Sequence, residues 1–142
     1  MDGMAEVVVM IGLPGAGKTT LFRERFAATH VRVEKKERIE PALAAGSSVV
    51  VDSTNPRRAD RAPIIALAHA RGARVIGYFF DVSTRAAVAR NATRTGKDRV
   101  PNVAIFTVAK RLEPPTGDEG FDQLFRVRIA EDRSLHVEPI NG

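Results

Sequence analysis

The segment GLPGAGKT, residues 12–19, carries the residue types and the spacing best suited to chemistry in this chain. It fits the pattern GxxxxGK[ST] and lies between an apolar run and a segment with helical spacing, as that pattern requires. Its glycines let the backbone curl so that N–H groups point inward at phosphate oxygens, and the following helix begins with its positive dipole end at the anion. The segment therefore predicts a site for the triphosphate of ATP or GTP.

Individual residues of this loop have distinct expected roles. Lys18 is expected to reach the terminal phosphates, and the hydroxyl of Thr19 is expected to ligate Mg²⁺. Thr20 is interpreted as a helix residue near the base or the α-phosphate. The predicted nucleotide-binding residues of the loop are Gly12, Pro14, Gly15, Ala16, Gly17, Lys18, Thr19 and Thr20.

A second chemical group follows the apolar run at residues 48–51, which continues into the segment DSTNP, residues 52–56. The carboxyl ends of parallel strands face one crevice, so Asp52 is expected beside the phosphate loop, holding the Mg²⁺ shell directly or through water. The alternative is that Asp52 caps the turn that follows, for which its polar successors also have the chemistry. The two roles are compatible.

These motifs need strands and helices that bring them together. Apolar runs rich in β-branched residues predict strands buried on both faces, at residues 6–11, 30–33, 48–51, 74–80 and 124–129. The segments between them have helical spacing, at residues 18–28, 34–45, 57–71, 84–94 and 103–112. This alternation implies right-handed crossovers and a parallel sheet with helices on both faces.

Turn and cap residues support these boundaries. Gly46 and Gly72 fall where helix C-caps are expected, and Ser83 and Asn102 fall where N-caps are expected. Residues 113–120, EPPTGDEG, are expected to form a loop because they contain two consecutive prolines and two glycines. After the last strand, a turn and a further apolar run favour a terminal antiparallel hairpin.

Length and composition define the class of protein. A chain of 142 residues with 44% hydrophobic residues predicts one domain, residues 1–142. The absence of cysteine excludes disulfides and thiolate metal sites, and the short apolar start predicts neither a signal peptide nor a membrane span. We therefore expect a soluble, cytoplasmic protein. The formal net charge of +5 suits an anionic ligand, although small domains rich in Ala and Arg are often basic for no specific reason.

The sequence resembles the polynucleotide 5′-hydroxyl kinase-like branch of P-loop kinases, which includes the kinase domain of polynucleotide kinase-phosphatase. The resemblance rests on the segments GLPGAGKTT, DSTNP followed by arginines, RNATRTGKDRVP (residues 90–101) and EPPTGDEGF (residues 113–121). It implies a three-layer α/β P-loop NTPase fold with strand order 2-3-1-4-5. It also implies a lid at about residues 94–101 that closes over ATP.

The resemblance matches Arg94 first and Arg90 second to lid arginines that touch the phosphates of ATP. Because they are four residues apart, both would lie on one face of the helix that leads into the lid. Phosphoryl transfer needs positive charge around the equatorial oxygens of the γ-phosphate and a site from which water is excluded. The alternative is a solvated basic helix end that complements the helix dipole.

The sequence departs from the resemblance after the second strand, where similar kinases carry an Asp as general base toward the acceptor hydroxyl. Residues 31–46 contain no Asp and form a shorter acceptor-site region. Glu34 is slightly favoured over Glu37 as a substitute, since both would lie at the carboxyl edge of that strand. The alternative is that both glutamates pair with the lysines and the arginine beside them.

Three functions fit these observations. The first is a kinase that transfers the γ-phosphoryl of ATP to a polynucleotide 5′-hydroxyl, with Mg²⁺ as cofactor and nucleic acid as partner. The second is a kinase for a small molecule, and the third is a catalytically weak nucleotide-binding module, which the missing Asp favours. A monomer is compatible with all three. A polynucleotide acceptor would need several cations that face its phosphates, for which the candidates are Arg57, Arg58, Arg61, Lys35 and Lys36.

Overall fold

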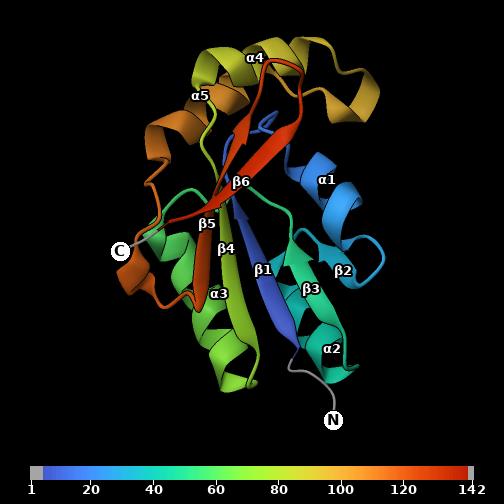
Figure 1. Cartoon of the computed structure of the whole chain (residues 1–142), viewed down its shortest axis with the longest axis vertical. Helices are drawn as coiled ribbons and strands as arrows, with labels where there is room; N and C mark the ends of the chain where they lie inside the picture. The colour runs from blue at the N-terminus through green and yellow to red at the C-terminus, as the bar shows by residue number, and fades with distance from the viewer. Residues whose placement is uncertain (1–4, 141–142) are drawn as a thin grey trace.

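The structure, a computed structural model, describes residues 5–140, whose strands form one six-stranded sheet (Figure 1). Residues 1–4 and 141–142 of the expected 1–142 domain lie outside the described part. The strands are β1 Glu6–Ile11, β2 His30–Val33, β3 Ser48–Val51, β4 Arg74–Phe80, β5 Gln123–Ile129 and β6 Leu135–Pro139.

The sheet has the strand order β2-β3-β1-β4-β5-β6. Every neighbouring pair is parallel except β5 and β6, which are antiparallel. The predicted α/β fold, its order 2-3-1-4-5 and the terminal hairpin are therefore confirmed. This order places the carboxyl ends of β1, β2 and β3 along one edge, which is where ligands bind in such sheets.

Helices cover both faces of the sheet (Figure 1). They are α1 Lys18–Leu21, α2 Ile39–Ala44, α3 Arg58–Ala70, α4 Thr84–Ala92 and α5 Asn102–Arg111. One buried cluster joins alternate residues of β1 to α2 and α3, and the other joins the remaining residues of β1 to α1, α4 and α5. Because both faces of β1 are fully buried, this strand is a rigid base for the loop that follows it.

The prediction that every parallel strand is buried on both faces is wrong for β2. This strand lies at the edge of the sheet and pairs only with β3. Val31 and Arg32 are exposed, and 44% of the surface of Val31 is accessible. An edge strand has solvent beside it, so it accommodates a charged side chain at a position where a central strand would not.

Two predicted helices are shorter than expected. The helix predicted at residues 18–28 consists of α1 and a π-helical turn, Phe22–Phe26. The helix predicted at residues 34–45 is a 3₁₀ turn, Lys36–Arg38, followed by α2. Pro41 favours the late start of α2, since proline lacks an N–H group and is best accommodated in the first turn of a helix.

Three of the four predicted helix caps are confirmed. Gly46 and Gly72 have positive φ angles of 85° and 73° at the ends of their helices. The hydroxyl of Ser83 accepts the Ala86 N–H at 3.1 Å. Asn102 is not an N-cap; it is the first residue of α5, since Pro101 precedes the helix in extended conformation. Of the helices in the described part of the chain, none combines the length and the apolarity that a membrane span requires.

Candidate functional site

The loop between β1 and α1 is held tightly against α4 and β4. Gly15 has a φ angle of 86°, and a Cβ atom added there would lie 2.8 Å from the carbonyl oxygen of Ala87 in α4. A Cβ atom at Gly12 would lie 2.9 Å from the Cβ of Phe80 in β4. Both positions therefore require glycine, since the neighbouring backbone cannot move away.

Two further side chains brace the backbone of this loop. The buried side chain of Asn55 donates to the carbonyl of Met10 at 2.7 Å, and the Nε of Arg90 donates to the carbonyl of Gly15 at 2.8 Å. Asn55 has a positive φ angle of 42°, a region in which asparagine is enriched among non-glycine residues. The DSTNP segment thus orders the loop as well as supplying Asp52, a role that sequence analysis did not assign to Asn55.

Lys18 lies across the loop, with its ammonium group buried. Its Nζ donates to the carbonyls of Gly12 at 3.0 Å and Leu13 at 2.8 Å. Burial lowers the pKa of Lys18 to about 8; the carboxylate of Asp52 opposes this shift, and the positive charge of Arg94 adds to it. Lys18 is therefore poorly solvated and close to cationic neighbours, so an anion that displaced the two carbonyls would stabilise its charge.

Asp52 joins the loop to the edge strand β2. One of its carboxylate oxygens, Oδ2, accepts the hydroxyl of Thr19 at 3.1 Å and the Nε of Arg32 at 2.7 Å. The outer nitrogen of Arg32 also donates to Glu34 at 3.2 Å. Sequence analysis missed Arg32. The signal that identifies it is the strand order, because β2 lies beside β3 and an arginine near the end of β2 can reach the residue that follows β3.

The oxygen atoms of Thr19 and Asp52 fit a magnesium ion. A hydroxyl and a carboxylate at 3.1 Å from one another are the hard oxygen ligands that Mg²⁺ takes, and the ion usually completes its shell with water and phosphate oxygens. Among residues 5–140, no group of three or more His, Cys, Asp or Glu side chains gathers that could hold a metal alone. The donor set therefore suits a metal that arrives with a nucleotide.

Asn91, a buried residue of α4, joins the two ends of the predicted lid. Its amide nitrogen donates to the carbonyl of Val100 at 2.6 Å, and its amide oxygen accepts the N–H of Val100 at 3.0 Å. Arg94 lies inside the segment that is closed in this way, where it donates to the carbonyl of Asp98 at 3.4 Å. Arg94 also lines a hollow of about 240 Å³ together with Lys18, Thr19 and Asp52.

A second hollow, of about 440 Å³, lies between α4 and the turn that joins β5 to β6. Its walls combine apolar groups, such as Ile129 and Ala130, with the side chains of Arg90, Arg94 and Arg133. The prediction that Arg90 and Arg94 share one helix face is wrong, because α4 ends at Ala92 and Arg94 follows it. Both side chains line this hollow, but Arg90 is bound to the loop backbone whereas Arg94 faces the loop residues. A flat ligand joined to an anion on the loop would have room here.

Residues 31–115, more than half of the chain, match the family model described as the AAA domain. The chain belongs to the AAA domain family. Solved structures with the same fold include an unliganded sugar kinase from Janibacter sp. HTCC2649, with a TM-score of 0.64 and 18% identity over 87% of this chain and 85% of that chain. Kti12 from Chaetomium thermophilum in complex with ADP-AlF3 has a TM-score of 0.63 and 18% identity, over 89% of this chain and 92% of that chain.

A third similar structure is AvrRxo1-ORF1:-ORF2 with ATP, with a TM-score of 0.65 and 15% identity. The match covers 94% of the AAA-domain chain and 57% of that protein. At these identities the similarity establishes the α/β P-loop NTPase fold alone. The match to the family model begins at Val31, so the phosphate loop is assigned by its own sequence and geometry.

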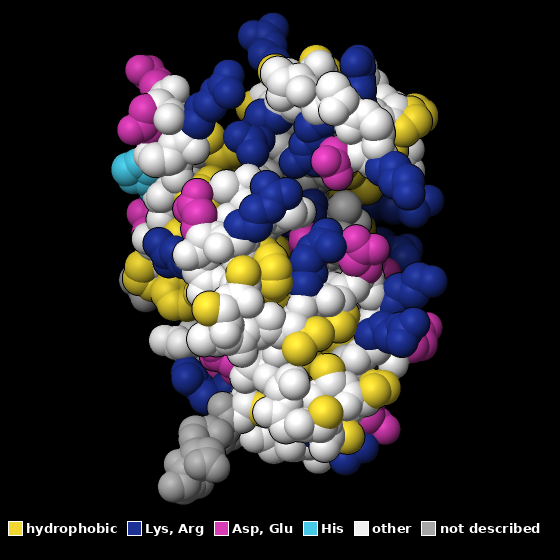
Figure 2. Space-filling view, turned by 90° about the vertical axis from the view of Figure 1, so that its right-hand side faces the viewer, with side chains coloured by type: hydrophobic (Ala, Val, Ile, Leu, Met, Phe, Trp, Pro, Cys, Tyr) yellow, Lys and Arg dark blue, Asp and Glu magenta, His cyan; other side chains and the backbone are white. Residues whose placement is uncertain are grey.

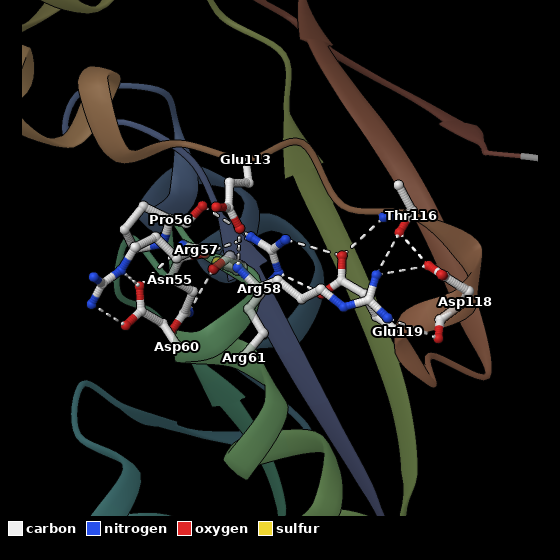
Figure 3. A network of polar contacts seen from close by, with 11 residues as sticks. Asn55, Pro56, Arg57, Arg58, Asp60, Arg61, Glu113, Thr116, Asp118 and Glu119 are labelled. Atoms are coloured by element: carbon white, nitrogen blue, oxygen red, sulfur yellow. Dashed lines mark hydrogen bonds and ion pairs between the residues drawn. The ribbon is translucent and has the colours of Figure 1, made fainter.

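The arginines after DSTNP pair with acidic side chains of the AAA domain, and burial removes Arg61 from the predicted set of cations that face a polynucleotide (Figure 3). Arg61 is fully buried and binds both carboxylate oxygens of Glu119, at 2.8 and 3.0 Å. Arg57 pairs with Asp60, and Arg58 pairs with Asp118. Asp118 and Glu119 belong to the loop at residues 113–120, whose acidic side chains reach back to the start of α3.

The two candidate general bases have different surroundings. Glu34 is exposed, pairs with Arg32, and lines the same hollow as Lys18 and Asp52. Glu37 is exposed on the 3₁₀ turn and does not line that hollow. It also does not line a separate hollow at the carboxyl end of β2, formed by residues 31–35, 38, 41 and 42. The alternative in which Glu34 pairs with the basic residues that follow it does not occur within residues 5–140, where its partner is Arg32 of β2.

Proposed function

We propose that this AAA-domain protein is a P-loop kinase that transfers the γ-phosphoryl group of ATP, or of GTP, to a hydroxyl group on an acceptor bound beside β2. One observation carries this proposal: Lys18, Thr19, Asp52 and Arg94 line a single hollow at the carboxyl end of the sheet. These groups supply what phosphoryl transfer needs, namely cations near the phosphates and oxygen ligands for a metal. Similar structures described as a sugar kinase and as ATP and ADP-AlF3 complexes support it.

The nucleotide would lie along the loop with its γ-phosphate toward Lys18 and Arg94. The backbone N–H groups of the loop and the first turn of α1 would bind the inner phosphates. The nucleoside would then occupy the hollow of about 440 Å³ between α4 and the β5–β6 turn, which adjoins the loop through Arg90.

Each residue of the hollow has a defined task in the transfer. The acceptor oxygen attacks the γ-phosphorus, the bond to the β–γ bridging oxygen breaks, and ADP leaves. Lys18 and Arg94 stabilise the charge on the transferring group, while the closed lid excludes water. Mg²⁺ held by Thr19 and Asp52 would neutralise charge on the β- and γ-oxygens. Glu34 is placed to accept the acceptor proton.

The acceptor class follows from the charges around the site. The resemblance implies a polynucleotide 5′-hydroxyl, but the three arginines that could have followed its backbone are engaged with Asp60, Asp118 and Glu119. This pairing favours a small hydroxyl compound as the acceptor. The exposed Lys36 and its basic neighbours keep the polynucleotide as a second candidate.

The test is incubation with γ-labelled ATP and Mg²⁺ in the presence of a 5′-hydroxyl oligonucleotide or of a panel of small hydroxyl compounds. We expect label to move to a small compound, and Lys18→Ala to abolish it. Glu34→Gln should lower the rate about 10²-fold without changing ATP affinity, whereas Glu37→Gln should have little effect. Tight ATP binding with no labelled acceptor would replace the kinase with a catalytically weak nucleotide-binding module.

A further inference from the structure

A hollow of about 600 Å³ lies at the carboxyl end of β2, outside the nucleotide site. We name it the β2 hollow; it is lined by residues 31–35, 38, 41 and 42. Arg32 and Glu34 line both the β2 hollow and the smaller hollow that contains Lys18 and Asp52. A compound in the β2 hollow would therefore lie next to the γ-phosphate position, and the volume suits a small molecule.

The 3₁₀ turn after β2 aligns two cations over this hollow. The turn is closed by the N–H of Arg38, which donates to the carbonyl of Lys35 at 3.0 Å. Lys35 precedes the turn in extended conformation, and Arg38 is the last residue of the turn. Lys35 and Arg38 both line the hollow, whereas Lys36 and Glu37 do not.

The charges of Lys35 and Arg38 are not compensated within residues 5–140, since neither has a carboxylate within 4 Å there. The other charged residues of the hollow, Arg32 and Glu34, pair with each other at 3.2 Å, and Arg32 also forms an ion pair with Asp52. The hollow therefore has two cations in excess. Figure 2 shows the side of the molecule that carries β2, with basic side chains gathered over its upper part, where Figure 1 places α4.

Two uncompensated charges in a small hollow fit a dianion. A phosphate monoester carries about −1.5 to −2 charges at pH 7 and three acceptor oxygens, which match an ammonium and a guanidinium better than a single carboxylate does. Val31, Pro41 and Ala42 add an apolar wall that suits the carbon skeleton of such a compound. A polynucleotide would need a longer track of cations than these two residues provide.

We propose that the β2 hollow binds the acceptor of the kinase reaction, and that this acceptor is a small hydroxyl compound that already carries a phosphate monoester. Lys35 and Arg38 hold the phosphate, and the free hydroxyl lies toward Glu34 and the γ-phosphate. The proposal rests on the proposed kinase function. The substrate is thus a compound that an earlier phosphorylation has prepared, and the product carries two phosphate groups.

The first test uses inorganic phosphate as the probe, with the nucleotide site filled by Mg²⁺ and a non-hydrolysable ATP analogue. We expect phosphate to shift the amide NMR signals of residues 31–38. The double substitution Lys35→Met with Arg38→Met should weaken phosphate binding about tenfold or more. The matched control is Lys110→Met with Arg111→Met at the exposed end of α5, which removes the same charge and should preserve binding. Equal weakening by both pairs, or shifts elsewhere, would overturn the proposal.

The second test compares acceptors in the transfer reaction: a sugar phosphate, its unphosphorylated sugar and the corresponding sugar acid. We expect the lowest KM for the sugar phosphate, by about tenfold over the neutral sugar, and loss of that preference in the Lys35 and Arg38 variant. Equal use of the neutral sugar, or preferential labelling of a 5′-hydroxyl oligonucleotide, would overturn the proposal and leave the kinase function intact. Failure of the kinase function is a separate result, seen as no transfer to any acceptor.

Discussion

Arg32 donates its Nε–H to Oδ2 of Asp52 over 2.7 Å, so a cation from the edge strand neutralises the carboxylate that is proposed to ligate magnesium. The Asp52 side chain is only 3% exposed, and its Oδ2 also accepts the hydroxyl of Thr19. The lone pairs of this oxygen are thus occupied in the ligand-free protein. Arg32 has to leave Asp52 before the same oxygen can serve as a metal ligand.

The substitution Arg32→Met should therefore strengthen metal binding. It keeps an unbranched apolar stem but removes the guanidinium group, so the buried carboxylate loses its partner, which lowers the stability of the metal-free protein. We expect the free Mg²⁺ concentration that half-saturates binding of a non-hydrolysable ATP analogue to fall about tenfold or more. Calorimetric titration at a series of Mg²⁺ concentrations measures this.

Arg71→Met is the control for that experiment, because it breaks an exposed ion pair with Glu40 and should leave the magnesium midpoint unchanged. If Arg32→Met destabilises the protein equally with and without Mg²⁺ and the analogue, the ion pair is structural in both states. An unchanged midpoint would contradict the competition between Arg32 and the metal.

Proton uptake should accompany nucleotide binding between about pH 8 and pH 10. Burial lowers the pKa of Lys18 to about 8, so the free protein loses this proton as the pH rises through 8, while an unfolded chain keeps it up to its ordinary pKa of 10.5. The cost of burying the charged amine is therefore fully present below pH 8, and stability rises with pH between the two values. A bound triphosphate raises the pKa of Lys18 again.

Calorimetry at pH 8.5 in buffers of different ionisation enthalpy measures that uptake. Lys18→Ala should abolish it and should weaken triphosphate binding far more than adenosine binding, because Lys18 meets the phosphates and not the base. Equal losses for both ligands would indicate general misfolding, and uptake that persists in the variant would point to another group.

Arg94→Ala should slow phosphoryl transfer about 10²-fold or more while ADP affinity changes little, since its charge acts on the transferring group. Steady-state rates and ADP titrations separate the two effects. Arg99→Ala, a change at another arginine of the lid, is the control and should keep most of the rate. An Arg94 variant as fast as the parent would remove Arg94 from the mechanism.

Arg61→Met should strongly destabilise the fold. The substitution leaves the Glu119 carboxylate, whose side chain is 2% exposed, as an unpaired buried charge, at a cost of about 3–5 kcal/mol. Denaturant unfolding measures the loss, and the second substitution Glu119→Gln should recover part of it. Arg57→Gln, which breaks a surface pair, should have a far smaller effect. Similar losses for Arg57 and Arg61 would contradict this account.

The strands were predictable because their signals are local, whereas their order was implied by the resemblance to P-loop kinases. Each run of β-branched residues predicts a strand at its own position. The segments GLPGAGKT and DSTNP identify the edge of the sheet where β1 and β3 end. Helix boundaries were less accurate where a single residue, such as Pro41, decides the start. The C-caps at Gly46 and Gly72 were correct because a positive φ angle at the end of a helix strongly favours glycine.

The pairings of arginines were not predictable in the same way. Arg61 binds Glu119, 58 positions later, and Arg32 binds Asp52, 20 positions later. Both contacts depend on which elements the fold brings together. The sequence around Arg61 or Arg32 alone therefore predicts an unpaired cation on the surface. For this reason Arg61 was predicted to face a polynucleotide, and the pairing of Arg32 with Asp52 was not predicted.

The double hydrogen bond between Asn91 and Val100 closes the neck of the predicted lid, so the entropy cost of loop closure grows only slowly with the length of the segment between them. Gly96, at the tip, has open space around its Cα, with no atom within 4 Å of an added Cβ. Residues inserted at this tip would leave the neck, α4 and the phosphate loop in place. We therefore expect that the length and charge of the predicted lid can change without any change to the sheet that carries it.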